Sequence, residues 1–168
     1  EVTVADNPAP QTVTLKRPFA QLNYGLSAAD MALADAVSPI VKASVKLDDA
    51  AYTKMNLLSG EMSGAGSVAF PAAPVLGEPL MVQAAGASAP TAYTYLAMNY
   101  ILVDREVSPN TTLTLYDASD AVVATVPVSL VPLQRNYRTN VVGNLISAPA
   151  ALNIVVEPSF ENDKNVVK

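Results

Sequence analysis

The carboxylates of this sequence form two short clusters that could bind a cation or hydrolyse a glycosidic bond. Asp48 and Asp49 are adjacent and could offer oxygens to Ca²⁺, but the regular acidic spacing of a calcium loop does not surround them. Asp104 and Glu106 flank Arg105, and two carboxylates can hydrolyse a glycoside when they face each other across a cleft. Because charged residues of this kind are common in turns, we interpret both clusters as solvated loop charges.

The chain contains no histidine and no cysteine. Histidine is the commonest general base, and these two residue types supply many of the metal ligands and nucleophile arrangements of enzymes. We therefore predict a non-enzymatic protein with no catalytic residue, no metal and no cofactor. The enzyme alternative requires a cleft with two carboxylates at catalytic spacing, one of them with a raised pKa.

Tyrosines are the remaining side chains that could recognise a ligand. Five of them could form a platform for sugar rings: Tyr52, Tyr93, Tyr95, Tyr100 and Tyr116. The chain has no tryptophan and only 6% aromatic residues, which is sparse for a carbohydrate-binding module. We expect core or interface tyrosines whose hydroxyl groups reach a partner, and we select Tyr93 and Tyr95 as the candidate aromatic contacts.

Charge and hydropathy exclude other classes of protein. The formal net charge is −5, and the ten Lys and Arg residues are scattered, whereas a nucleic-acid-binding protein would show a basic stripe. Charged residues make up 15% of the chain, below the ~25% of ordinary soluble domains, as is common in exported β proteins. The sequence has no unbroken apolar stretch of about 18 residues, so we predict no transmembrane helix. Since the chain starts without Met, we expect a removed targeting segment, a longer parent protein, or both.

Alternation of apolar and polar residues predicts most of the secondary structure. It indicates strands over residues 40–48, 93–103, 111–116 and 151–157, with Leu96, Met98 and Tyr100 on one face of the second, which we place centrally. Weaker patterns indicate strands over residues 12–22, 80–83, 121–130 and 134–146. Pro18 cannot donate to a strand ladder and therefore predicts an edge or a bulge in the first strand. Residues 71–90 are expected to be a connection around the irregular strand 80–83.

One Ala-rich segment breaks the strand pattern. Residues 28–36 are expected to form a two-turn helix that begins at the N-cap Ser27, stops before Pro39 and crosses between two sheets. The whole pattern predicts an all-β protein, an antiparallel β-sandwich of about seven or eight strands with Ig-like Greek-key character. We expect residues 1–168 to be a single domain, with residues 1–10 as a leader segment and residues 161–168 as a tail or a linker to a further domain.

The most distinctive segment is the run of residues 131–145. In an extended strand, Arg135 and Tyr137 point to one face, whereas Arg138 and Asn140 point to the other. Polar residues on both faces of an interior strand are costly unless they are paired. We expect a hydrogen-bonded structural strand in which Arg138 or Arg135 pairs with a carboxylate. A ligand site and a subunit contact stay open as alternatives for these four residues.

The same run carries a resemblance to a known family. The sequence VPLQRNYRTNVVGNL at residues 131–145, followed by LNIVVEPSF at residues 152–160, is similar to the fimbrillin-like proteins of Bacteroidales. Two weaker segments also match: LKRPFAQL at residues 15–22 and YLAMNY at residues 95–100. The matched segments follow the family order from about residue 12 to residue 160.

This resemblance implies a transthyretin-like β-sandwich that is exported through the periplasm as a lipoprotein and displayed at the outer membrane, on the cell surface. Relatives build fimbriae by exchanging a β-strand between subunits or act as adhesins, which is β-strand addition to an open sheet edge. The partners expected from it are other pilus subunits or surface ligands, with no nucleic acid and with the membrane reached only through a lipid anchor outside this chain. The alternative function is a glycan-binding module of a surface polysaccharide-uptake system.

Overall fold

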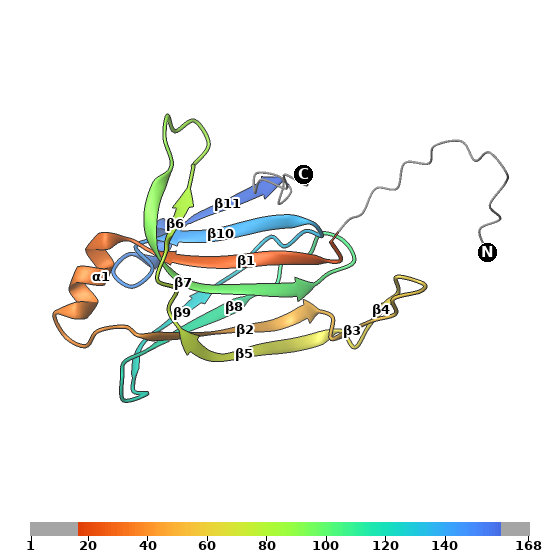
Figure 1. Ribbon diagram of the computed structural model, residues 1–168, viewed down its shortest axis with the longest axis horizontal. Helices are drawn as coiled ribbons and strands as arrows, with labels where there is room; N and C mark the ends of the chain where they lie inside the picture. The colour runs from red at the N-terminus through yellow and green to blue at the C-terminus, as the bar shows by residue number, and fades with distance from the viewer. Residues whose placement is uncertain (1–16, 159–168) are drawn as a thin grey trace, which may run out of the picture.

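The computed structural model describes residues 17–158, which fold into two packed β-sheets (Figure 1). The five-stranded sheet has the order β11 (Asn153–Pro158), β10 (Tyr137–Gly143), β1 (Phe19–Leu26), β7 (Thr91–Leu102) and β6 (Pro79–Val82). The four-stranded sheet has the order β5 (Gly66–Pro74), β2 (Lys42–Ala51), β8 (Thr111–Tyr116) and β9 (Val122–Val128). A short hairpin, β3 (Lys54–Met55) and β4 (Met62–Ser63), and one 3-10 turn (Pro149–Ala151) complete the described strands and turns. This confirms the predicted all-β sandwich, with nine strands in the two sheets rather than seven or eight.

The core lies between the two sheets and follows the alternation expected from the sequence. On β2, Val45 and Leu47 are buried, and on the neighbouring β8 Leu113 and Leu115 are buried as well. These side chains face Leu22 and its neighbours on β1 in one continuous apolar cluster. Burial of such side chains stabilises the fold by roughly 1.5–3 kcal/mol each, because it removes apolar surface from water.

The first strand lies in the middle of its sheet, so the edge or bulge predicted at Pro18 is wrong. Pro18 directly precedes the strand, where its missing N–H removes no ladder bond. β1 pairs antiparallel with β7 on one side and parallel with β10 on the other, and the parallel pair departs from a purely antiparallel sandwich. A central position buries both faces of β1, which explains why even Gln21 and Asn23 are buried. The predicted residues 12–16 of this strand, the leader 1–10 and the tail 161–168 lie outside the described residues.

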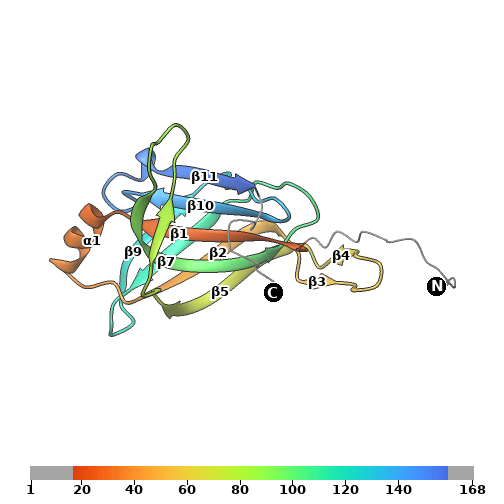
Figure 2. The ribbon, with the colours of Figure 1, turned by 45° about the horizontal axis from the view of Figure 1, so that its top comes forward.

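The helix α1 (Ala28–Asp35) connects the two sheets, as predicted, and it lies at one end of the sandwich (Figures 1 and 2). The Ser27 side chain caps it by accepting a hydrogen bond from the Asp30 amide at 3.2 Å. The buried Asp30 carboxylate accepts hydrogen bonds from the Ile146 amide at 2.7 Å and from the Ser147 hydroxyl at 2.5 Å. The helix is thereby tied to the connection between β10 and β11.

Two sequence expectations about the middle of the chain need correction. Residues 71–74 belong to β5 and not to a connection, although the strand expected at residues 80–83 is present as β6. The register between β1 and β7 shifts at Tyr24/Gly25, and this irregularity reverses the faces of β7. Leu96 therefore enters the core, whereas Met98 and Tyr100, expected beside it, are exposed by 42% and 48% on the outer face.

Candidate binding face on the five-stranded sheet

A row of hydrogen-bonded amide side chains crosses the outer face of the five-stranded sheet. Asn23 on β1 lies opposite Asn140 on β10, and Asn23 Nδ2 donates to Asn140 Oδ1 at 2.7 Å. Asn23 Oδ1 in turn accepts from Gln21 Nε2 at 2.9 Å and from the Tyr95 hydroxyl at 2.7 Å. These bonds link β1 to β10 and to β7 and reduce the cost of burying the amides, while Asn140 Nδ2 is buried without a hydrogen-bond partner among the described residues.

The row is extended toward the sheet edge by an ion pair. Arg138 lies opposite Gln21 on one side and opposite Glu157 of β11 on the other, and its guanidinium lies 3.3 Å from the Glu157 carboxylate. This confirms the expectation that one of the two arginines pairs with a carboxylate. The pair is partly exposed, so we assign it less than about 1 kcal/mol of stability.

The hairpin formed by β6 and the first part of β7 rises over one end of this face (Figures 1 and 2). Leu80 and Val82 of β6 pack on Val142, in a small apolar cluster separate from the main core. Gly25 makes this approach feasible, because a Cβ atom at that position would lie 2.9 Å from Tyr93 Cβ. Tyr93 is therefore a packing residue of this cluster, and its neighbour Tyr95 reaches the amide row with its hydroxyl.

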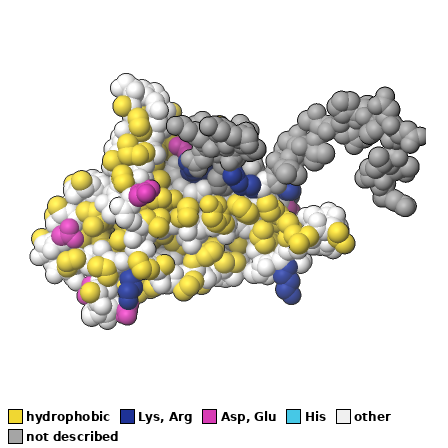
Figure 3. All heavy atoms as spheres, viewed as in Figure 1, with side chains coloured by type: hydrophobic (Ala, Val, Ile, Leu, Met, Phe, Trp, Pro, Cys, Tyr) yellow, Lys and Arg dark blue, Asp and Glu magenta, His cyan; other side chains and the backbone are white. Residues whose placement is uncertain are grey.

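The raised hairpin and the flat sheet enclose a depression of about 450 Å³, which we call the outer hollow. Its floor holds Gln21 and Asn23, and its walls are apolar or aromatic groups together with charged ones: Phe19, Leu80, Met81, Tyr95, Met98, Tyr100, Arg17, Arg138 and Glu78. Figure 3 shows hydrophobic side chains gathered in a band along β7, with Lys or Arg side chains beside it on the same face. The mixture of amides, rings and opposite charges fits a polar ligand that also presents apolar edges.

Aromatic geometry and electrostatics define the chemistry of the outer hollow. The rings of Phe19 and Tyr100 meet edge to face, with centroids 4.8 Å apart. Burial raises the pKa of the Tyr95 hydroxyl above its usual value, so it remains a neutral hydrogen-bond donor at physiological pH. Glu78 is the single carboxylate among the described lining residues, so two carboxylates do not face each other across this hollow. The arrangement is suited to binding through hydrogen bonds and ring contacts.

The four candidate residues of the run 131–145 lie at three different places in the structure. Arg138 and Asn140 are on the outer face, where Asn140 is fully buried beside the amide row. Arg135 lies before the strand, and its Nε donates to the Arg17 carbonyl oxygen at 3.4 Å. Tyr137 begins β10 and is half-buried opposite Pro158. Their roles in ligand or subunit contact stay predictions.

Sequence reasoning missed several residues of the outer hollow. Gln21 and Asn23 alternate with the apolar residues of β1, and their burial follows only from the central position of that strand. Met98 and Tyr100 were expected to share a face with Leu96, and the register shift turns them outward instead. The sequence feature that could have identified Gln21 and Asn23 is the presence of two amides at alternate positions in an otherwise apolar strand, because this pattern is unusual for a strand with one face in water.

The acidic clusters lie away from this face and have ordinary surface roles. Asp48 pairs with Lys46 at 3.2 Å, and the Tyr52 hydroxyl donates to Asp104 at 3.2 Å. Between residues 17 and 158, no three Asp or Glu side chains gather in a way that could hold a metal ion. The helices in that part of the chain are also too short or too polar to cross a membrane.

Comparisons with known proteins identify the family of the chain but no function. Neither a curated protein nor a solved structure matches it. One family profile, described as a family of unknown function (DUF6562), matches residues 1–167 and so spans nearly the entire sequence. The chain therefore belongs to the DUF6562 family.

Proposed function

We propose that this protein is a non-enzymatic structural or adhesive module of the cell surface that recognises its partner through the outer hollow. The observation that carries the proposal is the floor of buried amides, Gln21 and Asn23, beneath an open depression lined by Tyr95, Tyr100 and Arg138. Burying an amide is costly unless it is hydrogen-bonded. Apolar side chains would therefore be sufficient on an outer sheet face that served only packing. The resemblance to fimbrillin-like proteins supports surface display.

Met98 provides the sharpest test of this proposal. It is 42% exposed in the outer hollow, so Met98→Glu introduces a charge on a side chain of similar length without disturbing the core. The matched control is Val122→Glu on β9, which is 59% exposed on the other sheet. We expect the purified chain, displayed on beads, to adhere to intact cells of its source organism and Met98→Glu to reduce adhesion by at least about tenfold. Equal adhesion by both variants would exclude the outer hollow as the contact.

Surface display is tested separately on the full-length protein. We expect an antibody against this chain to label intact cells, and external protease to remove the labelling. A protein that is protected until the cells are broken would contradict the cell-surface assignment. That result would leave the binding chemistry of the outer hollow unaffected.

The edge strand β11, which pairs on one side only among residues 17–158, supports the assembly form of the proposal. Four edge strands bound the two large sheets, and two of them contain an internal proline, Pro71 in β5 and Pro127 in β9. In β6, Pro79 is the first residue of a strand of only 4 residues. In β11, Pro158 is the last residue, so the segment before it keeps all its N–H groups. An internal proline removes a ladder donor, and β11, with 6 residues, is the longer of the two edges that have none, so β11 is the edge at which strand addition between subunits is expected. Val156→Lys on β11 should reduce polymer formation measured by light scattering, whereas Val122→Lys on β9 should not.

A glycan-binding module is the second candidate, and the side chains of the outer hollow favour it specifically. The partly exposed Arg138 guanidinium can donate to sugar hydroxyls, and the exposed ring of Tyr100 offers an apolar face. On a glycan array, binding that is lost in Met98→Glu and kept in Val122→Glu would support this candidate. Adhesion to cells without binding to any glycan would indicate that the partner is a protein.

A further inference from the structure

Two leucines at the tip of the β3–β4 hairpin lie entirely outside the fold. Leu57 is 85% exposed and Leu58 is 100% exposed, although burial of each side chain would be favourable. The hairpin projects from the end of the sandwich opposite to α1, and hydrophobic side chains are visible at its tip (Figures 1 and 3). Adjacent exposed leucines on a protruding hairpin indicate a contact with another molecule.

The tip is held in a defined shape. The Asn56 side chain accepts hydrogen bonds from the Leu58 amide at 2.9 Å and from the Ser59 amide at 3.3 Å. The Gly60 amide donates to the Asn56 carbonyl at 2.8 Å, and Gly60 has the positive φ of 75° that such a turn requires. The turn amides are used internally, so the tip presents the two leucine side chains, with Ser59 and Glu61 also exposed beside them.

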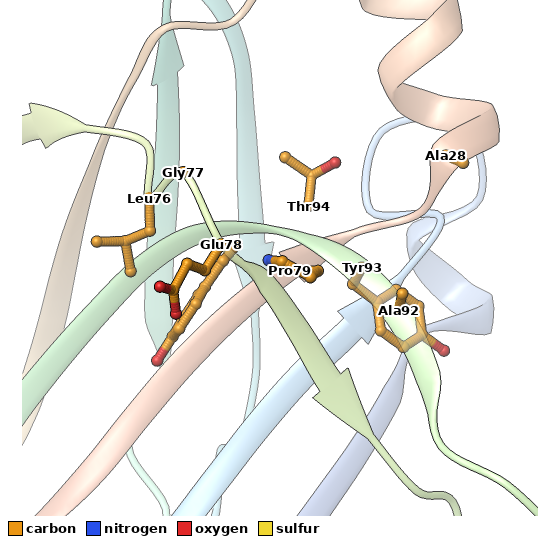
Figure 4. Close-up of a pocket in the computed structure, with 9 residues that line it drawn as sticks. Ala28, Leu76, Gly77, Glu78, Pro79, Ala92, Tyr93 and Thr94 are labelled. Atoms are coloured by element: carbon orange, nitrogen blue, oxygen red, sulfur yellow. The ribbon is translucent and has the colours of Figure 1, made fainter.

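A second depression, the end hollow, lies beside α1 at the opposite end of the sandwich. It measures about 300 Å³ and is lined mainly by Ala28, Leu76, Pro79, Ala92, Tyr93 and Thr94. Figure 4 shows Leu76 and Glu78 on one side of Pro79, and Ala92 and Tyr93 on the other. This volume is at the lower end of the ~300–1,000 Å³ of pockets that enclose small ligands, and it suits two side chains of leucine size.

Charged side chains lie beside both features. Lys54 is exposed at the base of the projecting hairpin, Glu61 is exposed beside its tip, and Glu78 is exposed at the end hollow. Within residues 17–158, none of the three forms an ion pair. Docking of the tip into the end hollow of another copy would bring an apolar projection to an apolar hollow, and it favours the orientation in which Lys54 faces Glu78 and Glu61 points away from it.

We propose that copies of this chain associate head to tail, with Leu57 and Leu58 of one copy inserted into the end hollow of the next. Because the contact joins different surfaces at opposite ends, it is heterologous and leads to open chains rather than closed dimers. This inference goes beyond the proposed function and does not use the edge of β11, although Glu78, Pro79 and Tyr95 line both hollows. Ala92 and Thr94 line the end hollow and are absent from the outer hollow, so the two can be tested independently.

Cysteine cross-linking tests the contact directly, since the chain has no cysteine of its own. Leu58→Cys and Ala92→Cys are made in chains carrying tags of different size and mixed under mild oxidation. We expect a mixed disulfide-linked dimer of the two variants that exceeds either self-linked product. Linkage of Leu58→Cys only to itself would show a tip-to-tip contact, and it would overturn the proposal, as would the absence of any linkage.

Sedimentation equilibrium measures the strength of the contact in the full chain. We expect Leu57→Ser combined with Leu58→Ser, or Ala92→Arg alone, to raise the dissociation constant of self-association at least about tenfold, with Val122→Ser as the control. Lys54→Glu and Glu78→Lys should each weaken association, and their combination should restore it. A wild-type chain that stays monomeric at millimolar concentration, or a double charge reversal without recovery, would refute the head-to-tail contact. The leucine and Ala92 variants change no residue that lines the outer hollow, so a loss of association in them would not bear on adhesion.

Discussion

The buried hydroxyl of Tyr24 predicts a specific alkaline weakness of the fold. Tyr24 lies between the sheets with no exposed surface, and its hydroxyl is 2.5 Å from Thr111 Oγ1 on β8. Thr111 Oγ1 itself donates to the Val128 carbonyl, so the tyrosine is the donor in this pair. Burial raises the pKa of Tyr24 from 10.0 to about 12, because a tyrosinate would have to be formed away from water.

This pKa shift sets the direction and size of the effect. Below pH 10 the hydroxyl is protonated in both the folded and unfolded states, so it contributes no pH dependence there. Above pH 10 the unfolded chain loses the proton first, the folded state binds more protons, and the free energy of unfolding falls as pH rises. At pH 11 the loss amounts to about 1.4 kcal/mol, and it approaches roughly 2.7 kcal/mol above pH 12.

Tyr24→Phe isolates the contribution. The variant loses one hydrogen bond and should be less stable than the wild type by about 1 kcal/mol at pH 8, whereas the difference should shrink or reverse at pH 11. Urea denaturation at a series of pH values measures both quantities. Other tyrosines, including the partly buried Tyr95, contribute equally to both proteins and cancel in the comparison. An equal loss of stability between pH 8 and pH 11 in both proteins would refute the reasoning.

Three further predictions concern the free energy of unfolding. Asp30→Ala leaves the Ile146 and Ser147 amides without their buried acceptor and should cost about 3–5 kcal/mol in urea denaturation; a cost below about 1 kcal/mol would show that water replaces the carboxylate. Gly25→Ala forces a Cβ atom to within 3.0 Å of Leu80 and should cost about 1–3 kcal/mol, with increased hydrogen exchange in β6; unchanged stability would contradict the tight packing of that hairpin. Arg138→Met removes the partly exposed ion pair of β10 and β11 and should cost about 1 kcal/mol or less, with a difference that diminishes in high salt.

The residues of β2, β8 and α1 show what could be predicted locally. Leu113 and Leu115 alternate with threonines, and an extended backbone necessarily places them on one face. Ser27 precedes an Ala-rich segment, and its hydroxyl caps the helix as expected. The pairing of Arg138 with a carboxylate also followed from the cost of an unpaired charge in an interior strand. These properties depend on neighbours in the chain, so the sequence by itself determined the all-β class, the helix and most of the strands.

Tertiary structure alone decided the candidate site. Asn23 and Asn140 are 117 positions apart, and only the parallel pairing of β1 with β10 places them within hydrogen-bonding distance. The register shift opposite Gly25 turns Met98 and Tyr100 outward, and the local alternation of apolar and polar residues does not predict such a shift. The outer hollow exists because the β6–β7 hairpin folds back onto the sheet. Strand order, register and hairpin position are set by competition among distant contacts across the whole chain, whereas alternation along one strand is set by the geometry of its own backbone.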